Sequence, residues 1–230
     1  MTDWLKALLS VFYPEVCLQC GDALDDDEHT ICNKCLGSLP RTFTAVSKNN
    51  QVEMKFAPDL QILRAAAFCL YNQDSAFRNL IHHAKYGNRP EIMYRLAQQA
   101  VAEWHDNGFF DGIDVIIPVP LHKKKLRERG YNQSDFIAHG IGDALGVTVC
   151  EDALTRIRND RSQTMQDIIT RATNVKGAFA INPKHNLKGL TLLLVDDVLT
   201  TGATLSECAA QLRKIPKTKI VVFTLATANS

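Results

Sequence analysis

Hydrophobic residues along the chain follow two spacings, and each spacing predicts a different kind of element. Strands are predicted at short apolar runs, which cover residues 62–71, 115–117, 147–150, 192–195 and 219–225. Helices that pack one face on a core are predicted where apolar side chains recur every three or four residues, over residues 75–86, 95–104 and 132–145. Strands that alternate with helices favour an α/β fold, with a mostly parallel sheet flanked by helices.

The run at residues 192–195 leads into polar residues suited to a sugar phosphate. It predicts a strand buried on both faces, followed by Asp196, Asp197, a hydroxyl-rich loop and a helix. Open α/β sheets bind ligands at such carboxyl ends. The two carboxylates suit the 2′- and 3′-hydroxyls of a ribose, whereas the loop and the helix N-terminus suit its 5′-phosphate. The predicted substrate-binding residues here are Val198, Leu199, Thr200, Thr201, Gly202, Ala203 and Thr204.

A purely structural interpretation of this stretch is the alternative. Asp196 and Asp197 would then only end the strand, and Thr204 with Glu207 would form a capping box on the next helix. Capping does not account for an apolar strand that leads into two adjacent carboxylates and then Thr-Thr-Gly. We therefore favour the sugar-phosphate site, with Asp196 and Asp197 as its catalytic candidates.

Positive charge is concentrated after the predicted strand at residues 115–117. The strand ends in Pro118-Val119-Pro120, and the cations that follow in a predicted loop are Lys123, Lys124, Lys125, Arg127 and Arg129. A solvated basic turn is the simplest interpretation. The loop would nevertheless face the same sheet edge as the two aspartates, where a leaving pyrophosphate or a nucleic-acid phosphate needs cations. Pro120, Arg127 and Arg129 are therefore further candidates for substrate binding.

Four of the seven cysteines form two Cys-x-x-Cys pairs, at Cys17, Cys20, Cys32 and Cys35. Two such Cys-x-x-Cys pairs supply the four thiolates of a tetrahedral zinc site. A redox pair is the alternative, but the pairs lie outside the predicted β–α–β region, which favours metal. A site closed by four protein ligands is structural. The odd cysteine count and this spacing indicate a reducing cytosol, so we expect a cytoplasmic protein.

Length and charge limit the remaining possibilities. A chain of 230 residues with a net charge of +1 can form one large domain and a small appendage, without a global field that would attract nucleic acid or membrane. We expect a zinc module at 1–45 and the α/β domain at 60–230, joined by an exposed polar connector at 47–51. Residues 4–12 predict a short amphipathic helix, too short to span a bilayer and without an export cleavage site.

Residues 195–204 resemble the phosphoribosyl pyrophosphate (PRPP) motif of the type I phosphoribosyltransferases. Together with four further segments, this motif resembles the ComF family, which is linked to natural competence and the use of imported DNA. They are the cysteine pairs and residues 118–121, 127–133 and 171–179. The resemblance spans nearly the whole chain.

The resemblance implies a type I phosphoribosyltransferase-like fold that binds PRPP, or a ribose phosphate, together with Mg²⁺. It also implies that the long polar segment at residues 156–174 is the loop that closes over the sugar. Asp160 and Gln166 depart from the threonine and aliphatic residue often found there in the family. These departures concern the chemistry of the loop and not the fold.

Three functions are compatible with these observations. The first is a ComF-like protein of DNA uptake, whose nucleotide site serves sensing or assembly while the zinc module and basic loop engage single-stranded DNA or a competence helicase. The second is an active phosphoribosyltransferase of nucleotide metabolism that transfers the sugar to a nitrogen acceptor. The third is a scaffold that the zinc module only stabilises.

Overall fold

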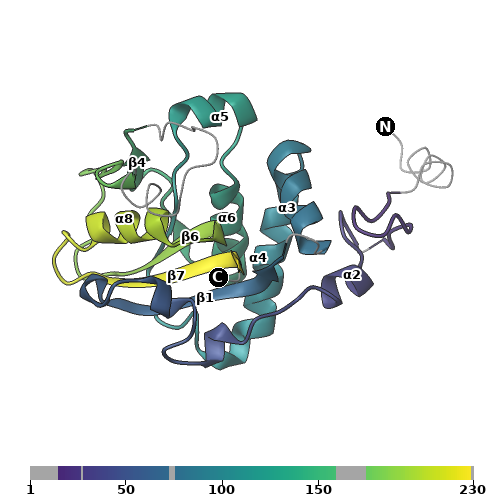
Figure 1. The fold of residues 1–230 in the computed structure, drawn as a ribbon, viewed down its shortest axis with the longest axis horizontal. Helices are drawn as coiled ribbons and strands as arrows, with labels where there is room; N and C mark the ends of the chain where they lie inside the picture. Colours follow the sequence, from purple (N-terminus) through teal and green to yellow (C-terminus); the bar gives the residue numbers. More distant parts are fainter. Residues whose placement is uncertain (1–14, 27, 73–75, 159–174, 229–230) are drawn as a thin grey trace.

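A five-stranded sheet forms the centre of the computed structural model, which describes residues 15–26, 28–72, 76–158 and 175–228. The strand order is β1-β7-β6-β2-β3, and every neighbouring pair is parallel. The strands are β1 (Ile62–Tyr71), β2 (Val115–Pro118), β3 (Thr148–Val149), β6 (Thr191–Leu199) and β7 (Lys219–Ala228). The predicted α/β fold with a parallel sheet is confirmed (Figure 1).

Helices cover both faces of this sheet. The helices of the sheet domain are α3 (Ala76–Tyr86), α4 (Glu91–Trp104), α5 (Lys123–Arg129), α6 (Gln133–Leu145) and α8 (Ala203–Leu212). Apolar residues of α3, α4 and α6 form one core cluster with Phe68 of β1 and Phe223 of β7. Residues of α8 form a second cluster with Leu192 and Leu194 of β6. Each cluster accounts for the apolar stripe of the helices that line it.

The helices agree with the spacing of their apolar residues, with one difference at a boundary. α3 buries the four apolar side chains that the pattern places on its inner face. α4 begins at Glu91, four residues before the predicted start at 95. The reason is local, because Pro90 caps the helix with a φ of −65° and Ile92 and Met93 extend the buried face.

The connector between the cysteine module and the sheet lies along the outer edge of β1. It contains the 3-10 helices η1 (Thr44–Val46), η2 (Glu53–Lys55) and η3 (Pro58–Leu60). The backbone N–H of Thr42 donates to Phe68 O at 2.9 Å, and the side chain of Asn50 donates to Ala65 O at 3.0 Å. Most of 47–51 is exposed, as predicted, but Asn50 is buried because it pairs with this edge.

Two local elements differ from the sequence-based expectation. The basic segment after β2 is the helix α5 and not a loop. Its first turn is capped by His122, whose Nδ1 accepts from Lys124 N at 3.2 Å, and Gly130 ends it with a φ of 86°. A short antiparallel hairpin of β4 (Leu154–Arg156) and β5 (Phe179–Ile181) was not predicted, because three-residue strands leave almost no periodic signal.

The remaining described elements are α2 (Asn33–Gly37), in the cysteine module, and the 3-10 helix η4 (His105–Asn107). The helix predicted at residues 4–12 and nearly all of the predicted closing loop at 156–174 lie outside the described residues. Within the described ranges, no helix is both long and apolar enough to cross a membrane.

Candidate phosphoribosyl-binding site

The site lies where β6, the middle strand of the sheet, extends beyond the end of its neighbour β2. β6 pairs with β7 as far as Leu199, but with β2 only as far as Val195, opposite Pro118. The strand therefore continues through Asp196 and Asp197, and does not stop before them as the sequence pattern suggested. Beyond Val195, the edge of β6 that pairs with β2 is covered by side chains. These side chains come from the end of α3 and the start of α6.

Asp197 is held by two side chains that sequence reasoning did not select. The residue is only 5% exposed, and its Oδ2 lies 2.7 Å from Lys85 Nζ and 2.8 Å from Gln133 Nε2, which donates to it. A buried carboxylate without a cation or donor would be strongly destabilising. Lys85, the penultimate residue of α3, is therefore part of the site.

Asp196 lies in a different electrostatic environment from its neighbour. Its Oδ1 accepts hydrogen bonds from Ser134 Oγ at 3.0 Å and from the backbone N–H of Asp197 at 2.9 Å. Burial, together with the charge of Asp197, raises the pKa of Asp196 to about 7. The pair therefore carries a proton that is released close to neutral pH.

The loop after β6 forms a small concave cradle. Gly202 has a φ of 81° and is the N-cap of α8, and a hollow of about 40 Å³ lies against Asp196 and the loop. The residues that line it are Asp196, Val198, Leu199, Thr200, Thr201, Gly202, Ala203, Thr204 and Leu205. Residues of the first turn of α8 line this hollow, and a helix N-terminus favours an anion, although Ala203 N also donates to Thr201 Oγ1 at 3.5 Å.

The cradle is supported by the connector. Lys55 Nζ donates to Thr200 O at 2.8 Å and to Ala228 O at 2.9 Å. A side chain at Gly202 would bring a Cβ within 3.2 Å of Lys55 O. The alternative capping box is wrong, because Glu207 Oε1 accepts instead from Gly177 N at 2.9 Å, and the N-cap is Gly202.

The basic helix α5 contributes to this region through only part of its charge. Lys125 and Arg129 line a cavity of about 350 Å³ with Lys85 and Tyr86, whose side chain is 70% exposed. Lys123, Lys124 and Arg127 are also exposed but do not line that cavity. Pro120 lies in the segment between β2 and α5, next to Val119, whose N–H donates to Val195 O at 2.9 Å.

The residues that sequence reasoning missed are Lys85, Gln133 and Ser134. Lys85 looked like an ordinary polar residue at the end of an amphipathic helix. Gln133 and Ser134 open α6, yet they are 5% and 1% exposed. Their burial depends on the sheet edge that they cover, and the local signals are a pair of polar residues before the apolar stripe of α6 and, for Gln133, its place in the segment 127–133.

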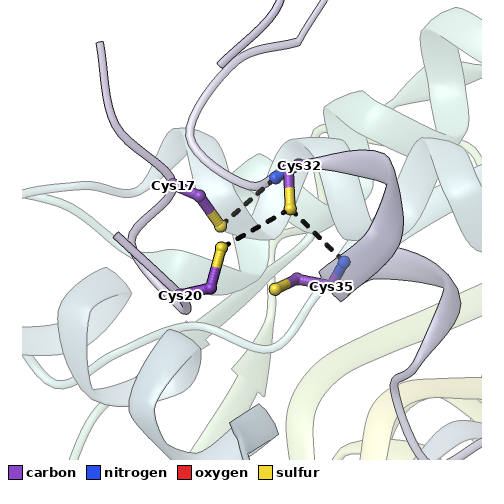
Figure 2. Close-up of side chains that lie close together, drawn as sticks. All are labelled: Cys17, Cys20, Cys32 and Cys35. Carbon is purple, nitrogen blue, oxygen red and sulfur yellow. Dashed lines mark hydrogen bonds between the residues drawn. The ribbon is translucent and has the colours of Figure 1, made fainter. Parts of the chain in front are cut away.

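The four predicted metal ligands converge in the N-terminal module (Figure 2). All four Sγ atoms lie within 4.8 Å of one another, and Cys20 Sγ is 3.8 Å from Cys32 Sγ. A tetrahedral sulfur site with metal–sulfur bonds of about 2.3 Å requires sulfurs about 3.8 Å apart. The cluster can therefore hold a metal ion.

Backbone N–H groups point at the sulfurs of Cys17 and Cys32. Cys17 Sγ accepts from Cys32 N at 3.3 Å and from Gln19 N at 3.4 Å, and Cys32 Sγ accepts from Cys35 N at 3.4 Å. Burial opposes ionisation of Cys17, but these backbone donors outweigh it and lower its pKa to about 6. A thiolate is the form that coordinates metal.

Comparison with known proteins agrees with the class that this geometry indicates. Residues 126–230 match the model of the phosphoribosyl transferase domain. Among solved structures, the chain is similar to adenine phosphoribosyltransferase from Saccharomyces cerevisiae, at 13% identity and a TM-score of 0.40, over 61% of this chain and 71% of that one. The matched residues 126–230 include β6, the loop after it and α8, so the candidate site lies within the part of the chain that resembles a phosphoribosyl transferase domain.

Similarity to curated proteins extends beyond this domain. Identity to the DNA utilization protein YhgH is 32% for Salmonella typhi, over 64% of this chain, and 28% for Escherichia coli K12, over 96% of this chain and 95% of that protein. The chain spans 65% of the length of the Salmonella relative in that match. Competence protein F of Haemophilus influenzae is 34% identical over 50% of this chain and 51% of its own. The chain is therefore similar to the YhgH proteins over nearly its whole length, and to competence protein F over half of it.

Proposed function

We propose that the chain binds the ribose 5-phosphate part of PRPP at the end of β6. The observation that carries this proposal is the cradle at the N-terminus of α8, which is lined by Asp196 and by the loop after β6. The phosphate would lie against residues 200–204, where backbone N–H groups and threonine hydroxyls are available. Asp196 and Asp197 would accept hydrogen bonds from the 2′- and 3′-hydroxyls, once the shared proton near Asp196 has been released.

Lys85 and the inner side of α5 are suited to the pyrophosphate. Lys125 and Arg129 line one cavity with Lys85, which also contacts Asp197, so three cations and the acidic Glu128 surround that cavity. Mg²⁺ bound with PRPP would neutralise the diphosphate charge. The residues of this chain would align the sugar and stabilise the leaving group, and Arg127 and Pro120 are proposed as flanking contacts.

A binding protein and an active transferase differ in turnover. We assign the site to PRPP binding within a ComF-like protein of DNA uptake, with transfer to a nitrogen acceptor as the second candidate. A pyrophosphate-release assay with Mg²⁺, PRPP and a panel of nucleobases separates the two. Release that depends on one base and is abolished in Lys85→Met would establish the transferase, whereas binding without release would establish the binding protein.

We propose that the cysteine cluster holds a structural zinc ion. The support is the match between the sulfur spacing and a tetrahedral site, since four protein thiolates leave no open position. The module would occupy residues 1–45 and the phosphoribosyltransferase-like domain residues 60–230. None of the seven described cysteines forms a disulfide, which suits the reducing cytoplasm that we propose as its location.

Single-stranded DNA is the proposed macromolecular ligand, with the zinc module as a second contact and a competence helicase as a candidate protein partner. The observation that favours DNA is an exposed aromatic ring beside cations. Tyr86 is 70% exposed, and Arg129 lies 5.5 Å from the centre of its ring. Stacking of bases on aromatic rings next to a basic path is the general way in which proteins bind single strands. The names of the relatives, which refer to DNA utilization and competence, point in the same direction.

A salt titration tests this second proposal. Reversal of Lys123, Lys124 and Lys125 to glutamate should make the dependence of affinity on salt shallower, by about 0.7 in log–log slope for each phosphate that is no longer neutralised. The matched control reverses Lys188, Lys214 and Lys217, which are exposed in the segments that precede β6 and β7. An equal effect in both triple variants, or no affinity at low salt, would contradict DNA binding at α5 and leave the basic helix to pyrophosphate alone.

A further inference from the structure

A second group of metal-ligand side chains lies at the small hairpin, away from the cysteine module. Cys150 follows β3, Asp152 precedes β4, and His185 follows β5. One ligand atom from each of the three lies within 4.8 Å of the other two. A thiol, a carboxylate and an imidazole together form a donor set typical of zinc.

The imidazole of His185 has an unusual contact for a buried nitrogen. Its Nε2 is buried and lies 2.6 Å from Asp152 Oδ1, which is an ion pair when the imidazole is protonated, but it makes no hydrogen bond with any described residue. Buried polar atoms normally have a partner. A metal ion bound between the nitrogen and the oxygen would supply that partner.

The other contacts hold the carboxylate in place for such a role. Cys150 Sγ lies 3.9 Å from Asp152 Oδ1, and the second oxygen, Oδ2, accepts from Asn182 Nδ2 at 2.9 Å. A hydrogen bond of this kind, from outside the ligand set, orients a metal-binding carboxylate. The adjacent Glu151 is not available, because it lies 2.6 Å from His139 Nε2.

We propose that Cys150, Asp152 and His185 form a second zinc site, with a water in the fourth position. Zinc bonds of about 2.0–2.3 Å in a tetrahedron place sulfur and oxygen about 3.6 Å apart, and nitrogen and oxygen about 3.4 Å apart. The sulfur–oxygen distance of 3.9 Å is close to the first value. The nitrogen–oxygen distance of 2.6 Å must lengthen by about 0.8 Å, so metal binding requires the partly exposed His185 ring to rotate.

The site would add a second link between the end of the main sheet and the hairpin, which already packs in the second core cluster through Leu154 and Phe179. Cys150 belongs to the end of the main sheet, whereas His185 follows the hairpin, and the two are joined by Asp152. The ion would therefore fasten the hairpin to β3, at the base of the segment that precedes residues 159–174. This proposal is independent of PRPP binding and of the cysteine cluster.

Metal analysis of the full chain tests the proposal. Protein equilibrated with Zn²⁺ and freed of excess metal should contain two zinc ions per chain. His185→Ala and Cys150→Ser should each contain one. His139→Ala is the matched control, because it removes another surface histidine that contacts a carboxylate, and it should retain two. Cys32→Ser should also contain one, which attributes the remaining ion to the second site.

Cobalt separates the two sites by spectroscopy. In the Cys32→Ser background, Co²⁺ should give a thiolate absorption band that disappears when Cys150→Ser is added. Equal zinc content in wild type and His185→Ala, or a cobalt spectrum that does not change on removal of Cys150, would overturn the proposal. Absence of the ion from His139→Ala as well as from His185→Ala would also overturn it, since the effect would then not be specific to the cluster.

Discussion

Replacement of Asp196 by asparagine should stabilise the protein while it weakens the site. Asparagine has nearly the same shape, and its side-chain oxygen keeps the acceptor for Ser134 and for the backbone N–H of residue 197. What it removes is a negative charge beside the buried carboxylate of Asp197. The change in the free energy of unfolding therefore measures the cost of that one charge, because the shape of the side chain stays nearly the same.

The size of the effect follows from the pKa of Asp196, which burial and the neighbouring charge raise from about 4 to about 7. Such a difference corresponds to about 4 kcal/mol of destabilisation once both folded and unfolded forms are ionised. The side chain is partly exposed and solvent screens it, so we expect about 1–2 kcal/mol. Because the folded-state pKa is the higher one, the penalty is absent below pH 4 and grows until the pH exceeds 7.

Urea unfolding at pH 5 and pH 8 measures this directly. Asp196→Asn should raise the free energy of unfolding at pH 8 by about 1–2 kcal/mol, and by less than half as much at pH 5. Asp106→Asn is the control, because that side chain is fully exposed, and it should change stability by less than about 0.5 kcal/mol at either pH. A gain that does not depend on pH, or a decrease at pH 8, would refute the electrostatic account of this pair.

Three other substitutions test neighbouring parts of the account. Lys85→Met leaves the buried carboxylate of Asp197 without its cation, so it should cost about 2 kcal/mol in urea unfolding, and the cost should shrink if Asp197→Asn is already present. Cys32→Ser should remove one zinc equivalent in metal analysis, and an unchanged content would exclude the cysteine cluster as a zinc site. Gly202→Ala should cost about 1–2 kcal/mol, because alanine is strained at a φ of 81° and its Cβ approaches Lys55 O; an unchanged unfolding midpoint would contradict this.

The sheet and its covering helices could be predicted because their signals are local. The apolar run of β1 and the spacing of buried residues in α3 depend on a few neighbouring residues, and both agree with the structure. The helix α5 could not be predicted in this way. Three consecutive lysines and a single leucine give no apolar stripe, and the helix depends on its caps at His122 and Gly130.

The strand and loop of the proposed site are visible in the sequence, whereas the side chains that support them are not. Asp196, Asp197 and residues 200–204 are contiguous in sequence, so their chemistry is visible in one stretch. Lys85 and Gln133 reach Asp197 only because the end of α3 and the start of α6 meet at the same sheet edge. His185 and Cys150 are likewise brought together by the hairpin. Such convergence is a property of tertiary packing, and no local pattern encodes it.

Calorimetry with ribose 5-phosphate and inorganic phosphate tests the central claim most directly. Wild type should bind both ligands at pH 8. The double variant Asp196→Asn and Asp197→Asn should bind ribose 5-phosphate about 100-fold more weakly, since two charged acceptors of the diol are removed at about 1.5 kcal/mol each. Its affinity for inorganic phosphate should remain, because the cradle at residues 200–204 is unchanged. A folded double variant that binds ribose 5-phosphate as tightly as wild type would contradict the assignment of the two aspartates to the sugar.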